Sequence, residues 1–316
     1  ERGFSFECVS IGELDHVRCY LPDLPKERLQ FTPSFASRAD YAAAKERAHW
    51  ITVDSLYPLQ NWPELFAGQA LTVRLDPGYG LGHHAHVKTG GVESKFGMSL
   101  NDLPAFSRLA GKIGARIEVI HAHVGSGVTD KTHWSNLFAQ LTGHAEAIGS
   151  VKAINVGGGL GVPYQDADED FDIDALAIAM AECRKQWPQY AIWMEPGRFM
   201  SAECGVLLTH VSQVVDKLGV RRIGLDADMN ALMRPALYQS KHRFVNLSRI
   251  ADSDVRRVDV VGPICESTDV LAHHIPLPES TAEGDVILID TAGAYGFVMA
   301  NTYNKRDLPR EVILDV

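Results

Sequence analysis

The sequence lacks the features that would place it among secreted, membrane or redox-active proteins. Its five cysteines include no CxxC pair and make no even disulfide framework, which favours a reducing compartment and buried thiols. No apolar run approaches the roughly 20 residues that a bilayer-spanning helix needs. Residues 1–4 do not resemble a signal peptide. We therefore expect a cytoplasmic protein with no membrane partner.

Positive charge is also scarce. The chain has 30 lysines and arginines against 40 acidic residues, which gives a net charge of −10. This balance argues against nucleic acid and against an anionic membrane surface as the main partner, although it allows a local positive pocket. A length of 316 residues suits one large domain together with a smaller one.

One glycine-rich stretch, Ile-Asn-Val-Gly-Gly-Gly-Leu-Gly at residues 154–161, stands out from this ordinary composition. Three consecutive glycines favour neither a strand nor a helix, because glycine loses more backbone freedom on ordering than other residues. They suit a place where bare backbone lies close against another group, and N–H groups on a glycine turn bind anions well. A flexible loop is the alternative for the stretch taken alone.

Short β-prone runs alternate with helical stretches over the first two thirds of the chain. This alternation predicts β/α units and a parallel sheet with right-handed crossovers. An eight-fold barrel needs eight strands, so seven runs leave a barrel one strand short, and a doubly wound open sheet remains the alternative. The expected strands are 4–9, 29–32, 50–53, 70–75, 117–120, 153–156 and 191–194, and the expected helices include 38–48, 101–114, 134–148 and 173–187, with Ser10 capping an earlier one.

The pattern changes after about Ser201. Short β-branched runs follow one another with turns rather than helices between them, which predicts an antiparallel β domain. We therefore expect a barrel domain over 1–201 and a β domain over 202–316. The expected strands of the second domain are 206–215, 220–225, 258–261, 286–289 and 312–314.

Polar groups with complementary chemistry follow three of the predicted barrel strands, and function in such barrels lies at the C-terminal ends of strands. His121, His123 and Ser126 follow one strand, the three glycines follow the next, and Glu195 begins the Glu-Pro-Gly-Arg run that ends at Arg198. The set offers a phosphate site, a flat imidazole, a carboxylate and a guanidinium. His121 and His123 share a strand face and suit a metal pair, but no third ligand is evident, so no metal site is expected. Glu195 taken alone also suits a simple turn.

Eight motifs, in order along nearly the whole chain, resemble those of pyridoxal-phosphate decarboxylases with the alanine-racemase barrel, and most closely those of the diaminopimelate decarboxylase family. The resemblance implies an α/β fold, with a TIM-like (β/α)8 barrel that lacks its first strand here and a C-terminal antiparallel β domain. The motifs are Phe-Glu-Cys-Val-Ser at 6–10, Thr-Gly and Ser-Lys-Phe-Gly within 89–97, His-Ala-His-Val-Gly-Ser at 121–126, Gly-Gly-Gly-Leu-Gly at 157–161, Glu-Pro-Gly-Arg at 195–198, Arg-Pro-Ala-Leu-Tyr at 234–238, Gly-Pro-Ile-Cys-Glu-Ser at 262–267 and Gly-Ala-Tyr-Gly at 293–296.

The resemblance also implies how the cofactor, pyridoxal 5′-phosphate, is bound. His123 stacks on the pyridine ring, Ser126 and the glycine backbone hold the phosphate, and Glu195 pairs with the pyridine nitrogen. A carboxylate there keeps the ring protonated, so that the ring accepts the electrons left by the loss of CO2. The implied cofactor-binding residues are His123, Ser126, Gly157, Gly158, Gly159, Glu195, Gly197, Arg198 and Tyr295.

The implied substrate is a small amino acid, and the implied assembly is a homodimer with shared active sites. Cys265 is the catalytic residue that supplies the proton after CO2 has left, and in this group it reaches the site of the partner subunit. Arginine offers a planar fork for a distal carboxylate. The implied substrate-binding residues are Arg198, Arg234, Tyr238, Glu266 and Tyr295.

An arginine beside a glutamate suits a distal ammonium together with a carboxylate, as on meso-diaminopimelate. Relatives that act on ornithine or arginine carry Asp directly after the cysteine, where this chain has Glu266. We therefore expect decarboxylation of meso-diaminopimelate to lysine. Decarboxylation of another carboxylated amine, such as carboxynorspermidine, is the alternative.

The family lysine that attaches covalently to the cofactor lies on the first barrel strand, before the segment that matches 6–10. This sequence has no lysine before Lys26, and neither Lys88 nor Lys95 stands at that position. We hypothesise that the chain is a truncated or partly ordered piece of a longer decarboxylase. A catalytically inactive relative without the lysine is the alternative. Two smaller departures are Glu7, where relatives usually have Asp, and the histidine-rich loop around His84, which fits the loop histidine of the family.

Overall fold

The chain forms two compact units in a computed structural model that describes residues 3–82, 91 and 94–314. The first unit comprises the residues up to Gly159 together with Asp172–Pro196, and the second comprises Leu160–Phe171 together with the residues from Gly197 onward. Each is described by itself below. The domain limits 1–201 and 202–316 remain predictions, and His84, Lys88 and Thr89 lie outside the described residues.

A parallel sheet forms the centre of the first unit, and all seven predicted barrel strands are present in it. The strands pair in chain order with every partner parallel, as in a singly wound barrel, and this order excludes the doubly wound alternative. Within the described residues, the sheet has β1 at one edge and β10 at the other. The strands are β1 (Phe6–Cys8), β2 (Leu29–Phe31), β3 (Trp50–Val53), β4 (Ala70–Asp76), β7 (Arg116–His121), β9 (Ala153–Asn155) and β10 (Ala191–Trp193).

Three short strands lie off this path. β6 (Met98–Ser99) pairs with the end of β4, and β5 (Leu81–Gly82) pairs in parallel with β8 (Gly125–Ser126). The second of these pairs brings Ser126 into a small ribbon beyond the end of β7. The C-terminal ends of the main strands therefore carry additional structure at the edge where function is expected.

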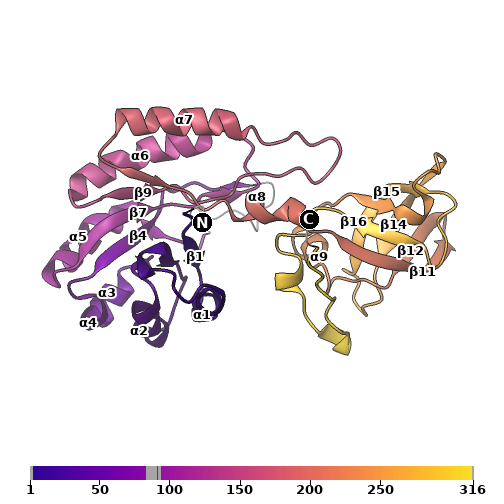
Figure 1. Cartoon of the computed structure of the whole chain (residues 1–316), viewed down its shortest axis with the longest axis horizontal. Helices are drawn as coiled ribbons and strands as arrows, with labels where there is room; N and C mark the ends of the chain where they lie inside the picture. The colour runs from indigo at the N-terminus through magenta and orange to yellow at the C-terminus, as the bar shows by residue number, and fades with distance from the viewer. Residues whose placement is uncertain (1–2, 83–90, 92–93, 315–316) are drawn as a thin grey trace. The chain divides into compact units, whose positions relative to one another are not determined.

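Helices lie on the outside of this sheet (Figure 1): α5 packs on β7, α6 on β7 and β9, and α7 on β10 and α6. The predicted cap of the first helix is confirmed, because the Ser10 hydroxyl accepts a hydrogen bond from the Glu13 N–H. The inner face of α6 buries Trp134 and Phe138 completely, which fixes this helix against the sheet. The helices are α1 (Ile11–Tyr20), α2 (Arg38–Arg47), α3 (Tyr57–Asn61), α4 (Pro63–Phe66), α5 (Leu103–Lys112), α6 (His133–Ile148) and α7 (Ile173–Gln186), with 3₁₀ turns at η1 (Lys26–Arg28) and η3 (Leu100–Asp102). None of the described helices is long and apolar enough to cross a membrane.

The second unit is built on a six-stranded sheet in the order β13-β16-β11-β12-β14-β15. The β domain was predicted correctly, but the pairing is not wholly antiparallel, because β12 and β14 run parallel. The sequence also missed β13 and β15. The elements are α8 (Gly197–Ser201), β11 (Leu207–Lys217), β12 (Val220–Leu225), α9 (Arg234–Tyr238), β13 (Phe244–Asn246), β14 (Val255–Val261), β15 (Val270–Pro278) and β16 (Val286–Ile289), with 3₁₀ turns η4 (Ala202–Cys204), η5 (Leu247–Arg249), η6 (Phe297–Met299) and η7 (Tyr303–Lys305).

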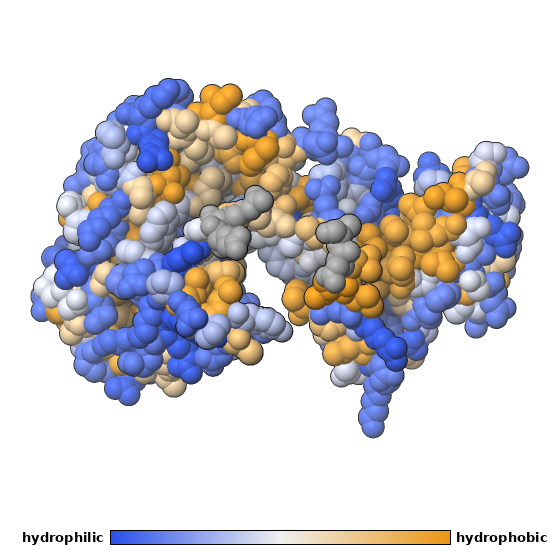
Figure 2. All heavy atoms as spheres, viewed as in Figure 1, coloured by the Kyte–Doolittle hydropathy of each residue, from blue (hydrophilic) through white to orange (hydrophobic). Residues whose placement is uncertain are grey.

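The strand predicted at 312–314 was wrong. Val312, Ile313 and Leu314 are exposed and have no strand geometry, because a β-branched run becomes a strand only where an edge offers hydrogen-bond partners. The core of the unit comes from the inward side chains of the other strands, among them Ile223, Val260 and Ile287. Figure 2 shows a broad apolar area on the visible face of this unit.

Candidate active site

Glu195 follows β10 and lies where the ends of several parallel strands meet. Its Oε1 accepts hydrogen bonds from Asn155 Nδ2 at 2.7 Å and from Gln30 Nε2 at 3.4 Å, and its Oε2 lies 3.3 Å from His121 Nε2. These partners come from β9, β2 and β7, because parallel strands place their carboxyl ends at one edge. The contact with Gln30 shows that the sheet curves enough to bring β2 and the end of β10 together.

The carboxyl group of Glu195 is held in its charged form. Burial would raise its pKa, but the neighbouring His121 and His123 and the hydrogen bond from Asn155 lower the pKa to about 2. Only 17% of the side chain is exposed. The edge of the sheet therefore presents a carboxylate that has its partners fixed and little water around it.

His123 is a neutral imidazole with a fixed tautomer. Its Nδ1 accepts a hydrogen bond from the Gly158 N–H at 3.1 Å, which assigns the ring proton to Nε2. Loss of hydration and the charge of Arg74 lower the pKa of His123 to about 4. A neutral ring presents a flat face without a positive charge, as stacking on a protonated pyridine ring requires.

The glycine turn is packed directly against the segment after β7. A Cβ atom on Gly157 would lie 2.7 Å from His123 Nδ1, and one on Gly159 would lie 3.1 Å from the carbonyl carbon of Gly125 and would overlap its oxygen. Both glycines also have a positive φ, of 68° and 90°. No other residue fits at either position.

Hydrogen bonds hold this turn on both sides. The Gly157 N–H donates to Asn155 Oδ1 at 2.9 Å, and the indole Nε1 of Trp134 donates to the Gly158 carbonyl at 3.0 Å. The Val128 N–H donates to the Gly159 carbonyl at 2.8 Å. The stretch is therefore a supported turn and not the flexible loop that the sequence left open.

The first unit thus gathers His123, Glu195 and the glycine turn in one set of direct contacts. Gly158 donates to His123, and the Glu195 N–H donates to the Gly157 carbonyl at 2.9 Å. Ser126 follows Gly125, whose carbonyl meets the turn. Their roles toward a cofactor remain predictions, but their convergence is what those roles require.

Sequence reasoning missed four residues of this edge: Gln30, Arg74, His121 as a partner of Glu195, and Asn155. Arg74 is only 8% exposed and lies 4.7 Å from the ring centroid of Phe96, and burial lowers its pKa. An arginine inside the apolar run 70–75 was a signal, because a charged side chain in a buried strand needs a partner or a ligand. The other three gave no signal, because their contacts join distant strands.

In the second unit, two arginines share one tyrosine. Arg198 Nη1 donates to the Tyr164 hydroxyl at 2.7 Å, and the guanidinium of Arg234 lies 4.3 Å from the centroid of the Tyr164 ring. The guanidinium of Arg198 also lies 4.8 Å from the centroid of the Tyr295 ring. The structure thus brings together the predicted Arg198, Arg234 and Tyr295, and it adds Tyr164, which was not among the predicted site residues.

Arg234 begins α9 and is 1% exposed. Tyr238 ends the same helix four residues later, on the same helix face. Gly197 begins α8, one residue before Arg198. These short helices, rather than the strands, carry three of the predicted substrate-binding residues of this unit, Arg198, Arg234 and Tyr238.

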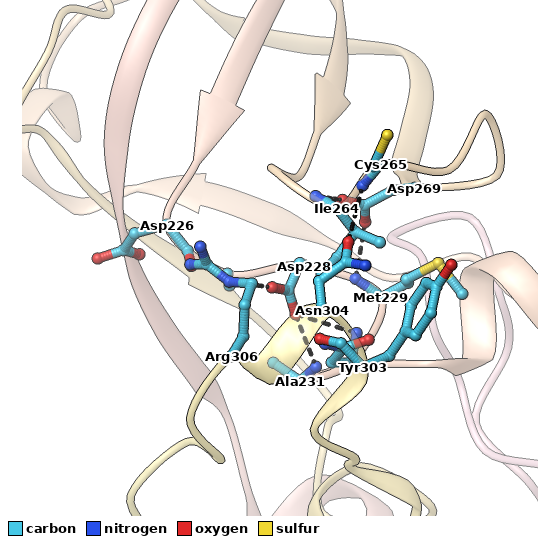
Figure 3. Close-up of polar contacts among 12 residues, drawn as sticks. Asp226, Asp228, Met229, Ala231, Ile264, Cys265, Asp269, Tyr303, Asn304 and Arg306 are labelled. Carbon is cyan, nitrogen blue, oxygen red and sulfur yellow. Dashed lines mark hydrogen bonds and ion pairs between the residues drawn. The ribbon is translucent and has the colours of Figure 1, made fainter.

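Cys265 and Glu266 lie on the loop between β14 and β15. The Cys265 N–H donates to Asn304 Oδ1 at 3.1 Å (Figure 3), and Glu266 Oε1 accepts a hydrogen bond from the Tyr303 hydroxyl at 2.7 Å. Both loop residues are exposed. Among the described contacts, this pair joins the 303–306 segment and not the two arginines.

Residues 1–202 match the model of the pyridoxal binding domain of pyridoxal-dependent decarboxylases. Diaminopimelate decarboxylase of Methanothermobacter thermautotrophicus is 35% identical over 99% of this chain and 75% of the relative, and that of Escherichia coli is 32% identical over 100% and 79%. The chain belongs to the diaminopimelate decarboxylase family.

Solved structures of the diaminopimelate decarboxylase family agree with this assignment. One crystal structure matches with a TM-score of 0.90 and 31% identity, and it covers 99% of this chain and 79% of its own. The Helicobacter pylori enzyme, solved in complex with L-lysine, matches with a TM-score of 0.86 and 29% identity over 96% and 77%. A barrel with an added β domain, as the sequence predicted, is therefore the fold of this chain.

Proposed function

We propose that this chain uses pyridoxal 5′-phosphate to decarboxylate meso-2,6-diaminopimelate to L-lysine and carbon dioxide, a step of lysine biosynthesis. The observation that carries the proposal is the Glu195 carboxylate, fixed at the edge of the sheet next to the neutral His123 and the glycine turn. Membership of the diaminopimelate decarboxylase family supports the choice of substrate.

The residues at this edge fit the cofactor. Glu195 is charged and nearly buried, so it suits a protonated ring nitrogen, and His123 offers an uncharged face to the ring. When bound, pyridoxal phosphate withdraws the electron pair that carbon dioxide leaves behind. Glu195 sustains that withdrawal, because its negative charge keeps the proton on the ring nitrogen.

We assign the phosphate to the side of the glycine turn. The N–H groups of Gly157 and Gly158 donate to Asn155 and His123, so these two glycines set the path of the turn. Ser126 and the Gly159 backbone would hold the phosphate. Gly197, the Arg198 side chain and Tyr295 are the further cofactor contacts that the family resemblance implies.

We assign the distal end of the substrate to Arg234, Tyr238 and Glu266, with further contacts from Arg198 and Tyr295. A guanidinium binds a carboxylate through two parallel hydrogen bonds, and Glu266 carries the opposite charge, which an ammonium requires. Cys265 supplies the proton to the carbon that has lost carbon dioxide.

We propose that the chain is a cytoplasmic homodimer with shared sites, and the second unit supports the dimer. Leu208, Leu237 and Val298 are exposed apolar residues of the unit that also carries Cys265. Apolar residues exposed on a unit of this size favour burial against another protein surface. The occupant we propose is a second copy of this chain, which brings its Cys265 and Glu266 to the neighbouring site.

The test is an assay on the protein purified as the cell produces it, with pyridoxal phosphate added. The expected result is equal release of carbon dioxide and L-lysine from meso-diaminopimelate. Turnover of carboxynorspermidine but not of diaminopimelate would show that the enzyme decarboxylates another carboxylated amine. Binding of the cofactor without turnover of either would indicate an inactive relative.

A further inference from the structure

The Cys265–Glu266 loop is exposed, yet its backbone is held by the side chain of Asp269, at the end of the same loop, and by a side chain of the 303–306 segment. The buried Asp269 accepts the Ile264 N–H at Oδ2 and the Met229 N–H at Oδ1, both at 2.7 Å (Figure 3). Asp269 therefore ties the start of the loop to the segment after β12. This tie fixes the backbone but does not reach the side chain of Cys265 or Glu266.

The 303–306 segment makes the second set of contacts with the loop. The Cys265 N–H donates to Asn304 Oδ1 at 3.1 Å, and the Tyr303 hydroxyl donates to Glu266 Oε1 at 2.7 Å. Two consecutive residues of one segment therefore contact the two consecutive loop residues to which the proposed function gives its proton donor and its substrate carboxylate.

The 303–306 segment is itself anchored to the body of the unit. Asn230 Nδ2 donates to the Tyr303 carbonyl at 2.8 Å, and Arg306 Nε lies 2.7 Å from Oδ2 of the buried Asp228 (Figure 3). Asn304 and Lys305 both adopt left-handed backbone, with φ of 54° and 56°. Such backbone is unfavourable for a residue like Lys305, although asparagine tolerates it better than most residues, and the contacts of the segment hold it in place.

We propose that Tyr303 and Asn304 are positioning residues, with Tyr303 orienting the Glu266 carboxylate and Asn304 setting the backbone of Cys265. The inference rests on the proposed function, because the roles of Cys265 and Glu266 come from it. It adds two residues outside the predicted site and names the group through which each acts.

The choice of a tyrosine at this position has a physical consequence. A tyrosine hydroxyl orients a carboxylate without cancelling its charge, whereas an arginine or lysine would neutralise it. One oxygen of Glu266 is engaged by Tyr303, and its negative charge stays available for a substrate ammonium. The hydrogen bond to Glu266 and its charge raise the pKa of Tyr303, so that the hydroxyl keeps its proton and remains a donor.

The first experiment measures kcat and KM for diaminopimelate in Tyr303→Phe, Glu266→Gln and the double variant of the holoenzyme. Tyr303→Phe is expected to raise KM about fivefold to tenfold, because Glu266 loses the hydrogen bond that orients it toward the substrate, with little change in kcat. In the Glu266→Gln background the same change is expected to have less than a twofold effect, because the carboxylate on which it acts is gone. The control is Tyr20→Phe on α1 of the first unit, which should leave KM unchanged. Equal effects of Tyr303→Phe in both backgrounds would overturn the Tyr303 assignment.

The second experiment does not depend on the substrate. Asn304→Gly keeps left-handed backbone favourable but removes the side-chain oxygen that accepts the Cys265 N–H. Asn304→Asp keeps both the backbone preference and an acceptor oxygen. Amide hydrogen exchange at Cys265 is expected to be about tenfold faster in the glycine variant and near wild type in the aspartate variant. Equal exchange in the two variants would overturn the Asn304 assignment. If the wild type fails to act on diaminopimelate while exchange responds as expected, the proposed function fails and the positioning role of Asn304 stands.

Discussion

Arg234 Nη1 lies 2.9 Å from Nε2 of His242, and both side chains are buried in the second unit. The other ring nitrogen of His242 lies 2.8 Å from the Asp290 carbonyl oxygen, to which it donates. His242 is thus a neutral acceptor that holds one end of the guanidinium, while the ring of Tyr164 lies against its face. Among the described residues, no carboxylate pairs with Arg234, which leaves its positive charge for a ligand.

Removing His242 should therefore weaken both the fold and the binding of the substrate. His242→Ala leaves a buried guanidinium N–H without its acceptor, which we expect to lower the free energy of unfolding by about 1–3 kcal/mol. KM for diaminopimelate should rise as Arg234 loses its orientation. Urea unfolding and steady-state kinetics measure the two effects.

His273→Ala is the matched control, because the His273 side chain is 73% exposed on β15 of the same unit. Its effect on the free energy of unfolding should stay within about 0.5 kcal/mol. If the two alanine variants have equal stability and equal KM, His242 does not orient Arg234.

The same histidine gives a prediction about pH. Burial lowers the pKa of His242 to about 4 from an ordinary 6.5, and the charges of Arg234 and Arg198 contribute. Unfolding therefore takes up a proton between pH 6.5 and 4, so this contribution to stability is complete above 6.5 and is lost as the pH falls through the window. In His242→Gln the free energy of unfolding should fall less steeply on acidification, by up to about 1.4 kcal/mol per pH unit. His123 has a similar shift but is present in both proteins, so its effect cancels. Parallel curves for wild type and variant between pH 4.5 and 6.5 would contradict the prediction.

The seven barrel strands were predictable because each is a short β-prone run that alternates with helical segments, and local pattern is sufficient for that. The choice between a barrel and a doubly wound sheet was not predictable, because the two differ only in which strands pair with one another. The sequence also failed to predict the parallel pairing of β12 with β14 and the absence of a strand at 312–314, for the same reason. A strand depends on the edge that it meets, and no local pattern contains that information.

The residues of the candidate site likewise divide into those that local motifs predicted and those that only the tertiary fold reveals. His123, Glu195 and the glycines were found because each follows a strand end within a recognisable motif. Gln30 contacts Glu195 across 165 positions of sequence, and Tyr164 contacts Arg198 across 34. Such partners come from the tertiary fold, and only the buried charge of Arg74 gave a local indication of one.

The glycine turn yields a pair of opposite predictions. Gly159→Ala forces a side chain into left-handed backbone and into the carbonyl of Gly125, which should lower the free energy of unfolding by about 2 kcal/mol or more. Gly143→Ala places the same methyl group in the interior of α6, where no atom of the described residues beyond the local helix backbone lies within 4 Å. It should raise the free energy of unfolding by roughly 0.5–1 kcal/mol. Thermal unfolding of the two variants measures the difference. Similar melting temperatures would show that the turn moves to accept a side chain.

Glu195→Gln tests the charge at the centre of the site. Glutamine keeps an oxygen for Asn155 and Gln30 but removes the negative charge, so the variant should fold and still bind pyridoxal phosphate. The ring nitrogen then loses the partner that keeps it protonated, and kcat should fall by about 100-fold or more, the scale of a lost proton-controlling group. Glu146→Gln on the exposed face of α6 removes a charge of the same kind and should leave kcat unchanged. A Glu195→Gln enzyme that keeps kcat within a few-fold of wild type would show that the depressed pKa of Glu195 serves only the fold. In that case the contacts with His121, Asn155 and Gln30 would have to be understood as structural, and the ring partner would have to be another residue.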